Sequence, residues 1–199
     1  MRNATFVAGI TIAVSALDAG AQGTPNLPLS PDHQIVAAIL PLPAEFRSSA
    51  RVMGYSPDGK LTTLRGGEGA FTCLASDPRA QRFHVACYHR SLEPFMARGR
   101  QLRSEGTAAE RVDSVRFREV KRGRLAMPKH PAALYSLTGP LTAFDTTTGT
   151  TTGARPLFVI YVPGATGAST GLSEKPAEGT PWIMFPGTPK AHVMFVPKM

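Results

Sequence analysis

The stretch AFTCLASDPRAQRFHVACYHRSLEPFMARGRQL, residues 70–102, decides how we interpret the rest of the chain. It holds the only two cysteines of the protein and two of its five histidines. Apolar runs at residues 70–74 and 83–88 predict two strands, because Asp77-Pro78 between them interrupts regular structure. A helix is expected directly after the second strand.

Cys73 and Cys87 enclose a loop of 15 residues, counting both ends. Two cysteines favour one disulfide in an oxidising compartment, and a loop of this size contributes roughly 3 kcal/mol in the chain-entropy treatment. The alternatives are two free buried thiols or a pair of thiolate metal ligands. The spacing lacks the C-x2-C pattern that is typical of zinc sites and of redox-active pairs.

The segment after the second strand predicts an amphipathic helix. Pro94 fits only in the first turn of a helix, so this helix is expected to begin near Ser91. Its apolar residues recur at helical spacing: Leu92, Phe95, Met96 and Leu102. A second helix is expected after Gly106, where Thr107 and Glu110 have the spacing of a capping box. Alternating apolar residues leave a strand possible for its second half.

A further helix and hairpin are expected before the cysteines. Ser30-Pro31-Asp32 predicts a helix start, because serine caps helices, proline suits the first position and an acid suits the first turn. Residues 50–55 and 60–65 flank Ser56-Pro57-Asp58-Gly59, which predicts a hairpin. Near the other end, the continuous apolar run 157–162 predicts a strand that is buried on both faces.

The composition and these elements together predict the fold class. Hydrophobic residues make up 42% of the chain, and its 19 Gly and 18 Pro indicate a folded protein rich in loops. Residues 182–185 and 190–196 predict a last hairpin, and the Thr/Gly-rich residues 146–153 an exposed loop. We predict a single α+β domain over residues 22–199. It would have a mostly antiparallel sheet, two or three helices packed on one side, and one disulfide.

The first 21 residues have the pattern of an export signal. Arg2 precedes an apolar run at residues 6–17, and Ala19-Gly20-Ala21 gives the small-x-small pattern that a signal peptidase cleaves. The run is shorter than the ~20 residues that span a bilayer, so no transmembrane segment is expected after cleavage. A buried N-terminal helix is the alternative. We therefore predict a periplasmic or secreted protein.

The net charge of +8 is concentrated in one region. Between Arg98 and Arg124, nine Lys/Arg residues accompany four acidic residues. The expected basic surface comprises Arg116, Arg118, Lys121 and Arg122, and it would attract an anionic envelope component. The alternative is an ordinary solvated helix face. Nucleic acid is not an expected partner, because Phe117 is the only aromatic residue available there for stacking on bases.

Four residues are candidate ligands of a divalent metal: His89, Glu93, His130 and His192. Imidazole and carboxylate groups are the usual donors for zinc and similar ions. A spacing of four would place His89 and Glu93 on one helix face, but Pro94 places His89 before the helix. The sequence contains neither H-x-H nor H-E-x-x-H. Scattered surface or hydrogen-bonded histidines, with no cofactor, are the alternative.

Residues 167–171 spell G-x-S-x-G, the pattern of a hydrolase nucleophile elbow. The preceding strand is expected to end at Pro163, and residues 172–176 cannot form the helix that an elbow needs. A loop of small residues therefore explains the pattern better, and we expect no catalytic residue there.

Several short stretches stand out in combination: residues 70–74, 87–89, 127–128, 133–139, 169–172 and 191–194. In this combination the chain resembles an uncharacterised family of exported bacterial proteins. The resemblance extends from about Arg51 to the end of the chain. It implies export and paired cysteines, and it carries no known activity.

These observations predict an exported protein, without catalytic activity, that binds a small ligand or an envelope component. The alternative is a metal-binding protein or metal-dependent enzyme that uses the four candidate ligands above.

Overall fold

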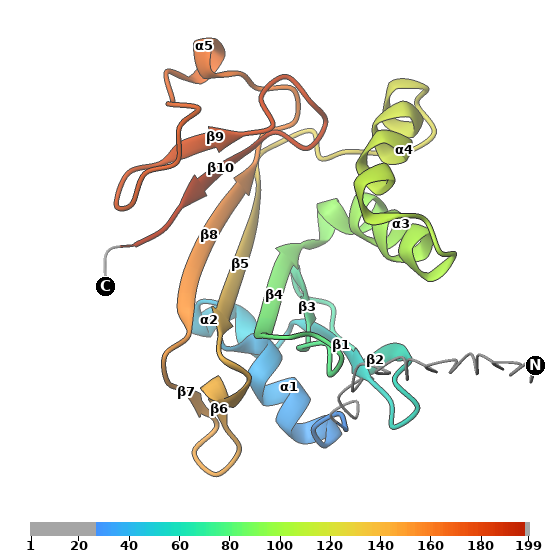
Figure 1. The fold of residues 1–199 in the computed structure, drawn as a ribbon, viewed down its shortest axis with the longest axis vertical. Coiled ribbons are helices and arrows are strands. Elements are labelled where there is room, and N and C mark those ends of the chain that lie inside the picture. Colours follow the sequence, from blue (N-terminus) through green and yellow to red (C-terminus); the bar gives the residue numbers. More distant parts are fainter. Residues whose placement is uncertain (1–26, 198–199) are drawn as a thin grey trace, which may run out of the picture.

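The computed structural model describes residues 27–197, so the expected export signal lies outside the described residues. An eight-stranded sheet forms the centre of the fold, in the order β2-β1-β3-β4-β5-β8-β10-β9 (Figure 1). Neighbouring strands are antiparallel except for the parallel pair β1 and β3. The strands of this sheet are β1 (Arg51–Tyr55), β2 (Leu61–Arg65), β3 (Phe71–Leu74), β4 (Phe83–His89), β5 (Ala132–Gly139), β8 (Arg155–Tyr161), β9 (Trp182–Met184) and β10 (His192–Phe195).

The described helices are short or medium in length. They are α1 (Pro31–Ile39), α2 (Ala44–Arg47), α3 (Glu93–Ser104), α4 (Ala109–Lys121) and α5 (Gly167–Thr170), with 3-10 turns η1 (Arg90–Leu92) and η2 (Leu141–Ala143). Within residues 27–197, no helix has the length and apolar character needed to cross a membrane. The predicted α+β class with a mostly antiparallel sheet is confirmed.

The predicted disulfide joins the neighbouring strands β3 and β4. Cys73 of β3 lies directly opposite Cys87 of β4, and the two residues are bonded and fully buried. Their side chains belong to a core cluster with Ala38, Val52 and Phe71. The disulfide prediction is therefore confirmed, and its position explains why the two strands flanking Asp77-Pro78 stay paired.

The helices divide between the two faces of the sheet, which differs from the single helix layer expected. Helix α1 covers the face of the disulfide, where Ala38 packs against Cys87. Side chains alternate along β4, so Tyr88 points to the opposite face and packs with Leu92 and Met96. In Figure 1, α3 and α4 form a pair beside the sheet, away from α1. The reason is that the chain leaves β4 at η1 and turns onto the Tyr88 face.

Three local expectations are corrected by the structure. Helix α4 has Ala108 at its N-cap and no side-chain cap, so the predicted capping box does not form, and the helix continues through the half where a strand was possible. Strand β8 is not buried on both faces, because Ile160 is 46% exposed while Val159 is buried. The expected loop at residues 146–153 contains β7 (Thr150–Thr151), which pairs with β6 (Phe144–Asp145).

Removing the disulfide tests its contribution to stability. We expect the variant with both Cys73→Ala and Cys87→Ala to lose about 3 kcal/mol of unfolding free energy, because the denatured chain regains the freedom of the 15-residue loop. Urea unfolding followed by circular dichroism measures the difference. Wild-type protein kept in reductant is the matched control and should behave like the variant. Equal stability of the oxidised protein and the variant would contradict the expectation.

Candidate functional site

The four candidate metal ligands do not come together. His89 lies on the disulfide face, where its ring centre is 5.8 Å from that of Phe71 and its Nδ1 is 2.8 Å from Ser91 Oγ. His192 lies on the other face, where its ring packs 5.1 Å from Tyr161. The sheet therefore separates the two histidines.

The other two candidates are equally separate. Glu93 accepts hydrogen bonds from Tyr88 and Arg100, both on the Tyr88 face, and His130 is exposed on the connection between α4 and β5. Among the residues that the structure describes, no group of three or more His, Cys, Asp or Glu residues is placed to hold a metal ion. The geometry gives no support to a metal site built from this set.

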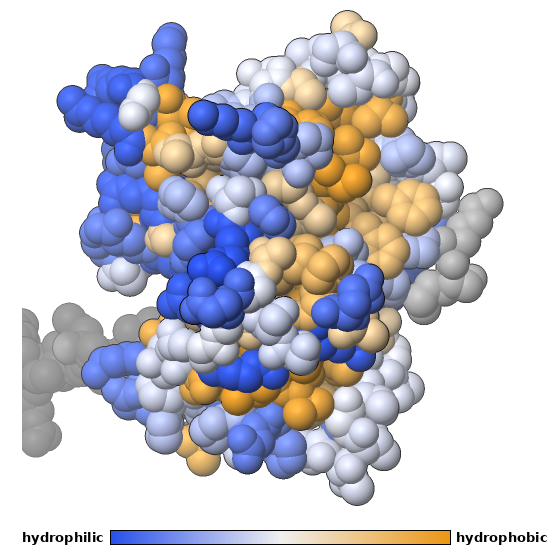
Figure 2. Space-filling view, turned by 180° about the vertical axis from the view of Figure 1, so that it is seen from behind, coloured by the Kyte–Doolittle hydropathy of each residue, from blue (hydrophilic) through white to orange (hydrophobic). Residues whose placement is uncertain are grey.

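Arg116 was expected on the surface, and this prediction is wrong. Its side chain is 7% exposed, its guanidinium lies 3.8 Å from the centre of the Phe95 ring, and its Nη1 donates to the Phe95 carbonyl at 3.0 Å. The planar guanidinium suits such stacking, which stabilises a desolvated cation. Arg118, Lys121 and Arg122 are exposed as predicted. Figure 2 shows the hydrophilic surface over the α3–α4 region.

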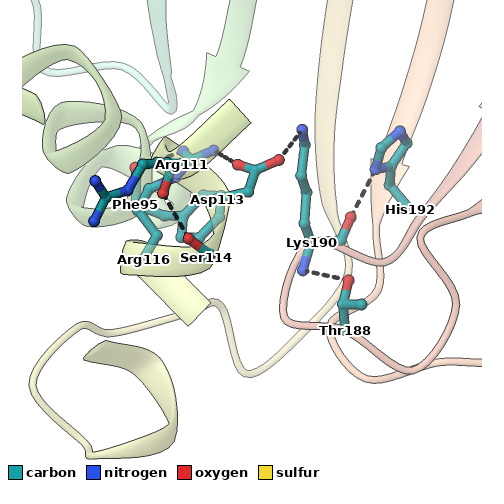
Figure 3. Close-up of polar contacts among 8 residues, drawn as sticks. All are labelled: Phe95, Arg111, Asp113, Ser114, Arg116, Thr188, Lys190 and His192. Atoms are coloured by element: carbon teal, nitrogen blue, oxygen red, sulfur yellow. Dashed lines mark hydrogen bonds and ion pairs between the residues drawn. The ribbon is translucent and has the colours of Figure 1, made fainter. Parts of the chain in front are cut away.

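Asp113 connects the helical pair to the C-terminal strands (Figure 3). Its carboxylate pairs with Arg116 on α4 and accepts a hydrogen bond of 2.8 Å from Lys190, which precedes β10. Burial raises the pKa of Asp113, but the hydrogen bonds from Lys190 and Arg116 outweigh burial and hold the pKa below its usual value. One acid thus forms ion pairs with two cations.

A cleft of about 820 Å³ lies between the β1–β2 hairpin and α3. This volume falls in the range of ligand pockets, roughly 300–1,000 Å³. The cleft is lined by Met53, Tyr55, Gly59, Lys60, Leu61, Leu74, Asp77, Arg79, Arg100, Gln101, Arg103 and Ser104. We call this feature the hairpin cleft. Gln34 of α1 fixes one wall, since it bonds the backbone amide of Tyr55 at 2.7 Å and its carbonyl at 2.9 Å.

The hairpin cleft is positively charged. Four cations and one acid line it. Lys60 pairs with Asp58 at 2.8 Å, outside the lining. Arg79 forms a bidentate ion pair with Asp77, with both hydrogen bonds at 3.0 Å, and Arg100 pairs with Glu93 at 2.7 Å. Burial, and then the negative charge of Asp77, raise the pKa of Tyr55 to about 12, so its hydroxyl stays protonated and remains a donor at neutral pH.

Arg103 differs from the other arginines of the cleft. Among the described residues, no acceptor or carboxylate bonds its guanidinium. The residue is exposed toward the cleft, yet burial around the guanidinium and the charges of Arg116 and Arg100 lower its pKa. A nearby negative charge would remove this electrostatic cost.

Sequence reasoning missed the hairpin cleft because its cations come from separate segments. The sequence did place Arg100 and Arg103 away from the apolar stripe of α3, which was the one available signal. Lys60 and Arg79 lie beside turn residues, and nothing in the sequence around them indicated a shared site.

No protein-family model, no curated protein and no solved structure matches this chain. The resemblance to an uncharacterised exported family therefore stays a prediction.

Two arginines of α4, Arg116 and Arg118, provide a matched test of burial. We expect Arg116→Met to lower the unfolding free energy by about 2–3 kcal/mol, because the stacked cation and its hydrogen bonds are lost. We expect Arg118→Met, on the exposed side of the same helix, to change it by no more than about 0.5 kcal/mol. Chemical denaturation of both variants measures these effects. If both variants lose a similarly small amount of unfolding free energy, the burial of Arg116 does not stabilise the protein.

His192 should make stability depend on pH. The residue is 6% exposed, and burial lowers the pKa of its imidazole below the usual value near 6.5. The folded state then binds fewer protons than the unfolded state, so stability is complete above about pH 6.5 and declines as the pH falls below it.

We expect unfolding free energies measured from pH 7.5 to about pH 5 to decline less steeply for His192→Gln than for the wild type. The exposed His130 gives the control, and His130→Gln should keep the wild-type slope. An unchanged slope in His192→Gln would contradict the assignment.

Proposed function

We propose that the protein is an exported binding protein, without catalytic activity, whose ligand occupies the hairpin cleft. The observation that carries the proposal is the combination of an apolar floor with an uncompensated guanidinium in one cleft of about 820 Å³. Apolar contacts and a few oriented polar groups are the usual composition of a ligand site.

The side chains of the hairpin cleft favour binding over catalysis. Its lining residues include no histidine or cysteine. Ser104 has its hydroxyl bonded to the Gln101 carbonyl at 2.8 Å, so no base activates it. Tyr55, with a pKa of about 12, is a hydrogen-bond donor at neutral pH and not a base. These groups orient a ligand and do not provide an acid–base pair.

Export is supported by the disulfide and by the amino-terminal sequence. Disulfides persist in oxidising compartments and are rare in reducing ones. Cys73 and Cys87 are bonded, and the first 21 residues have the pattern of a cleavable signal. A periplasmic or secreted location would expose the hairpin cleft to ligands of the cell envelope or of the medium.

The exposed basic face of α4 is a weaker candidate for the site. A smaller hollow of about 310 Å³ lies there, lined by Arg98, Val115, Arg118, Glu119, Arg122, Arg124 and Leu125. Its central cation is already neutralised, because Arg98 pairs with Glu119 at 2.8 Å. The hairpin cleft is larger and contains the unpaired cation, so we place the function there.

Fragment mapping by NMR tests the location of the site. A library of neutral, anionic and cationic fragments is added to the labelled protein, and amide shifts are followed. We expect the shifts of bound fragments to cluster at Tyr55, Leu74 and Arg103.

Two variants of β2 serve as a matched pair for this test. Leu61→Trp adds bulk inside the hairpin cleft and should abolish the shifts, whereas Thr62→Trp, on the other face of the same strand, should leave them. Fragments that bind only elsewhere, or shifts that persist in Leu61→Trp, would overturn the proposed site.

A further inference from the structure

We propose that the ligand of the hairpin cleft is an amphipathic anion, with an oxyanion head group such as a phosphate monoester and an apolar chain. This inference rests on the proposed function and adds the chemical class of the ligand. It follows from three features of the cleft: the crowding of two guanidinium groups, the distribution of cations on its walls, and its apolar floor.

Two guanidinium groups lie close together beside Gly99. A Cβ atom at Gly99 would lie 2.8 Å from Nη1 of Arg116 and 3.6 Å from Nη1 of Arg103. Glycine inside a helix costs roughly 0.5–1 kcal/mol relative to alanine, so its place in α3 has to be explained by this close approach. Both cations are thus held near one point of the helix surface.

The acid that could neutralise them is already shared. Asp113 binds Arg116 and Lys190, and it makes no hydrogen bond or ion pair with Arg103 among the described residues. Arg103 is therefore the cation of the cleft that makes no ion pair among the described residues, and its side chain lines the cleft. An oxyanion is the natural complement, because guanidinium groups bind phosphate and carboxylate oxygens through paired hydrogen bonds.

The cations stand on both walls of the cleft. Arg100 and Arg103 come from α3, while Lys60 and Arg79 come from the hairpin and from the loop after β3. Lys60 pairs with Asp58 and Arg79 with Asp77, so the attraction for an oxyanion comes chiefly from Arg103. The protonated Tyr55 hydroxyl adds a neutral donor. A cationic ligand would meet net repulsion in the same place.

The floor of the cleft explains why the anion should carry an apolar chain. Met53, Leu61 and Leu74 line the cleft and are only half buried in the protein alone. Covering such surface contributes about 25 cal/mol per Å² of apolar area, which a bare inorganic anion cannot gain. The cleft is therefore suited to a head group and a chain together.

Calorimetry with four probes separates the contributions of head and chain. The probes are octyl phosphate, inorganic phosphate, octyl glucoside and octyltrimethylammonium, each used as a monomer in solution. We expect octyl phosphate to bind at least tenfold more tightly than phosphate or octyl glucoside, and the cation not to bind. We expect Arg103→Gln to weaken octyl phosphate binding roughly ten- to hundredfold, the range for a lost charge-assisted hydrogen bond.

Arg118→Gln is the matched control, since it removes an exposed arginine outside the hairpin cleft and should leave binding unchanged. A second arm uses vesicles of phosphatidylglycerol. If the protein sediments with the vesicles and Arg103→Gln does not, the head group belongs to a membrane lipid. If the protein binds only the soluble probe, the ligand is a free amphiphile. Either result supports the proposal.

Two results would overturn the ligand class. If octyl glucoside binds as tightly as octyl phosphate, the anionic head group is wrong, although the cleft remains a binding site. If Arg103→Gln binds octyl phosphate as tightly as the wild type does, the ligand class is also wrong. The proposed function has a different failure: in the NMR map, no fragment of any charge would bind in the hairpin cleft.

Discussion

The direct opposition of Cys73 and Cys87 in neighbouring strands is the constraint on which the rest of the structure depends. Side chains alternate along a strand, so this pairing decides which residues of β4 meet α1 and which meet α3. Val85 and Cys87 enter the core beneath α1, and Tyr88 faces the helical pair. A slip of one residue would exchange the two sets and leave both cores without their apolar side chains.

The position of α3 on the Tyr88 face then sets the charge distribution of the cleft. Arg116 is buried against Phe95. Asp113 forms one ion pair with Arg116 and another with Lys190. Within residues 27–197 no acid forms an ion pair with Arg103, which lies beside Gly99 of α3 and lines the hairpin cleft. The stability of the helical pair and the charge of the cleft are thus linked, because Asp113 forms its ion pairs with Arg116 and Lys190 and not with Arg103.

Elements with strong local patterns were predictable from the sequence, whereas features that depend on tertiary packing were not. The hairpins, the main helices and the disulfide followed from turn residues, apolar spacing and cysteine number. Arg116 was misplaced because counting charges ignores the helical period: it lies four residues from Val112 and from Val120, on the buried stripe. The separation of His89 from His192 depends on strand order and on the faces that each strand presents. The hairpin cleft likewise exists only once three distant segments meet.

Nuclear Overhauser contacts within the central strands test the account most directly. We expect a strong contact between the Hα protons of Cys73 and Cys87, whose Cα atoms are 4.0 Å apart. In the same spectrum the Tyr88 ring should contact Met96 of α3, and Cys87 should contact Ala38 of α1. A Tyr88 ring in contact with α1, or Hα contacts shifted by one residue, would contradict the assignment of the two faces and with it the origin of the cleft.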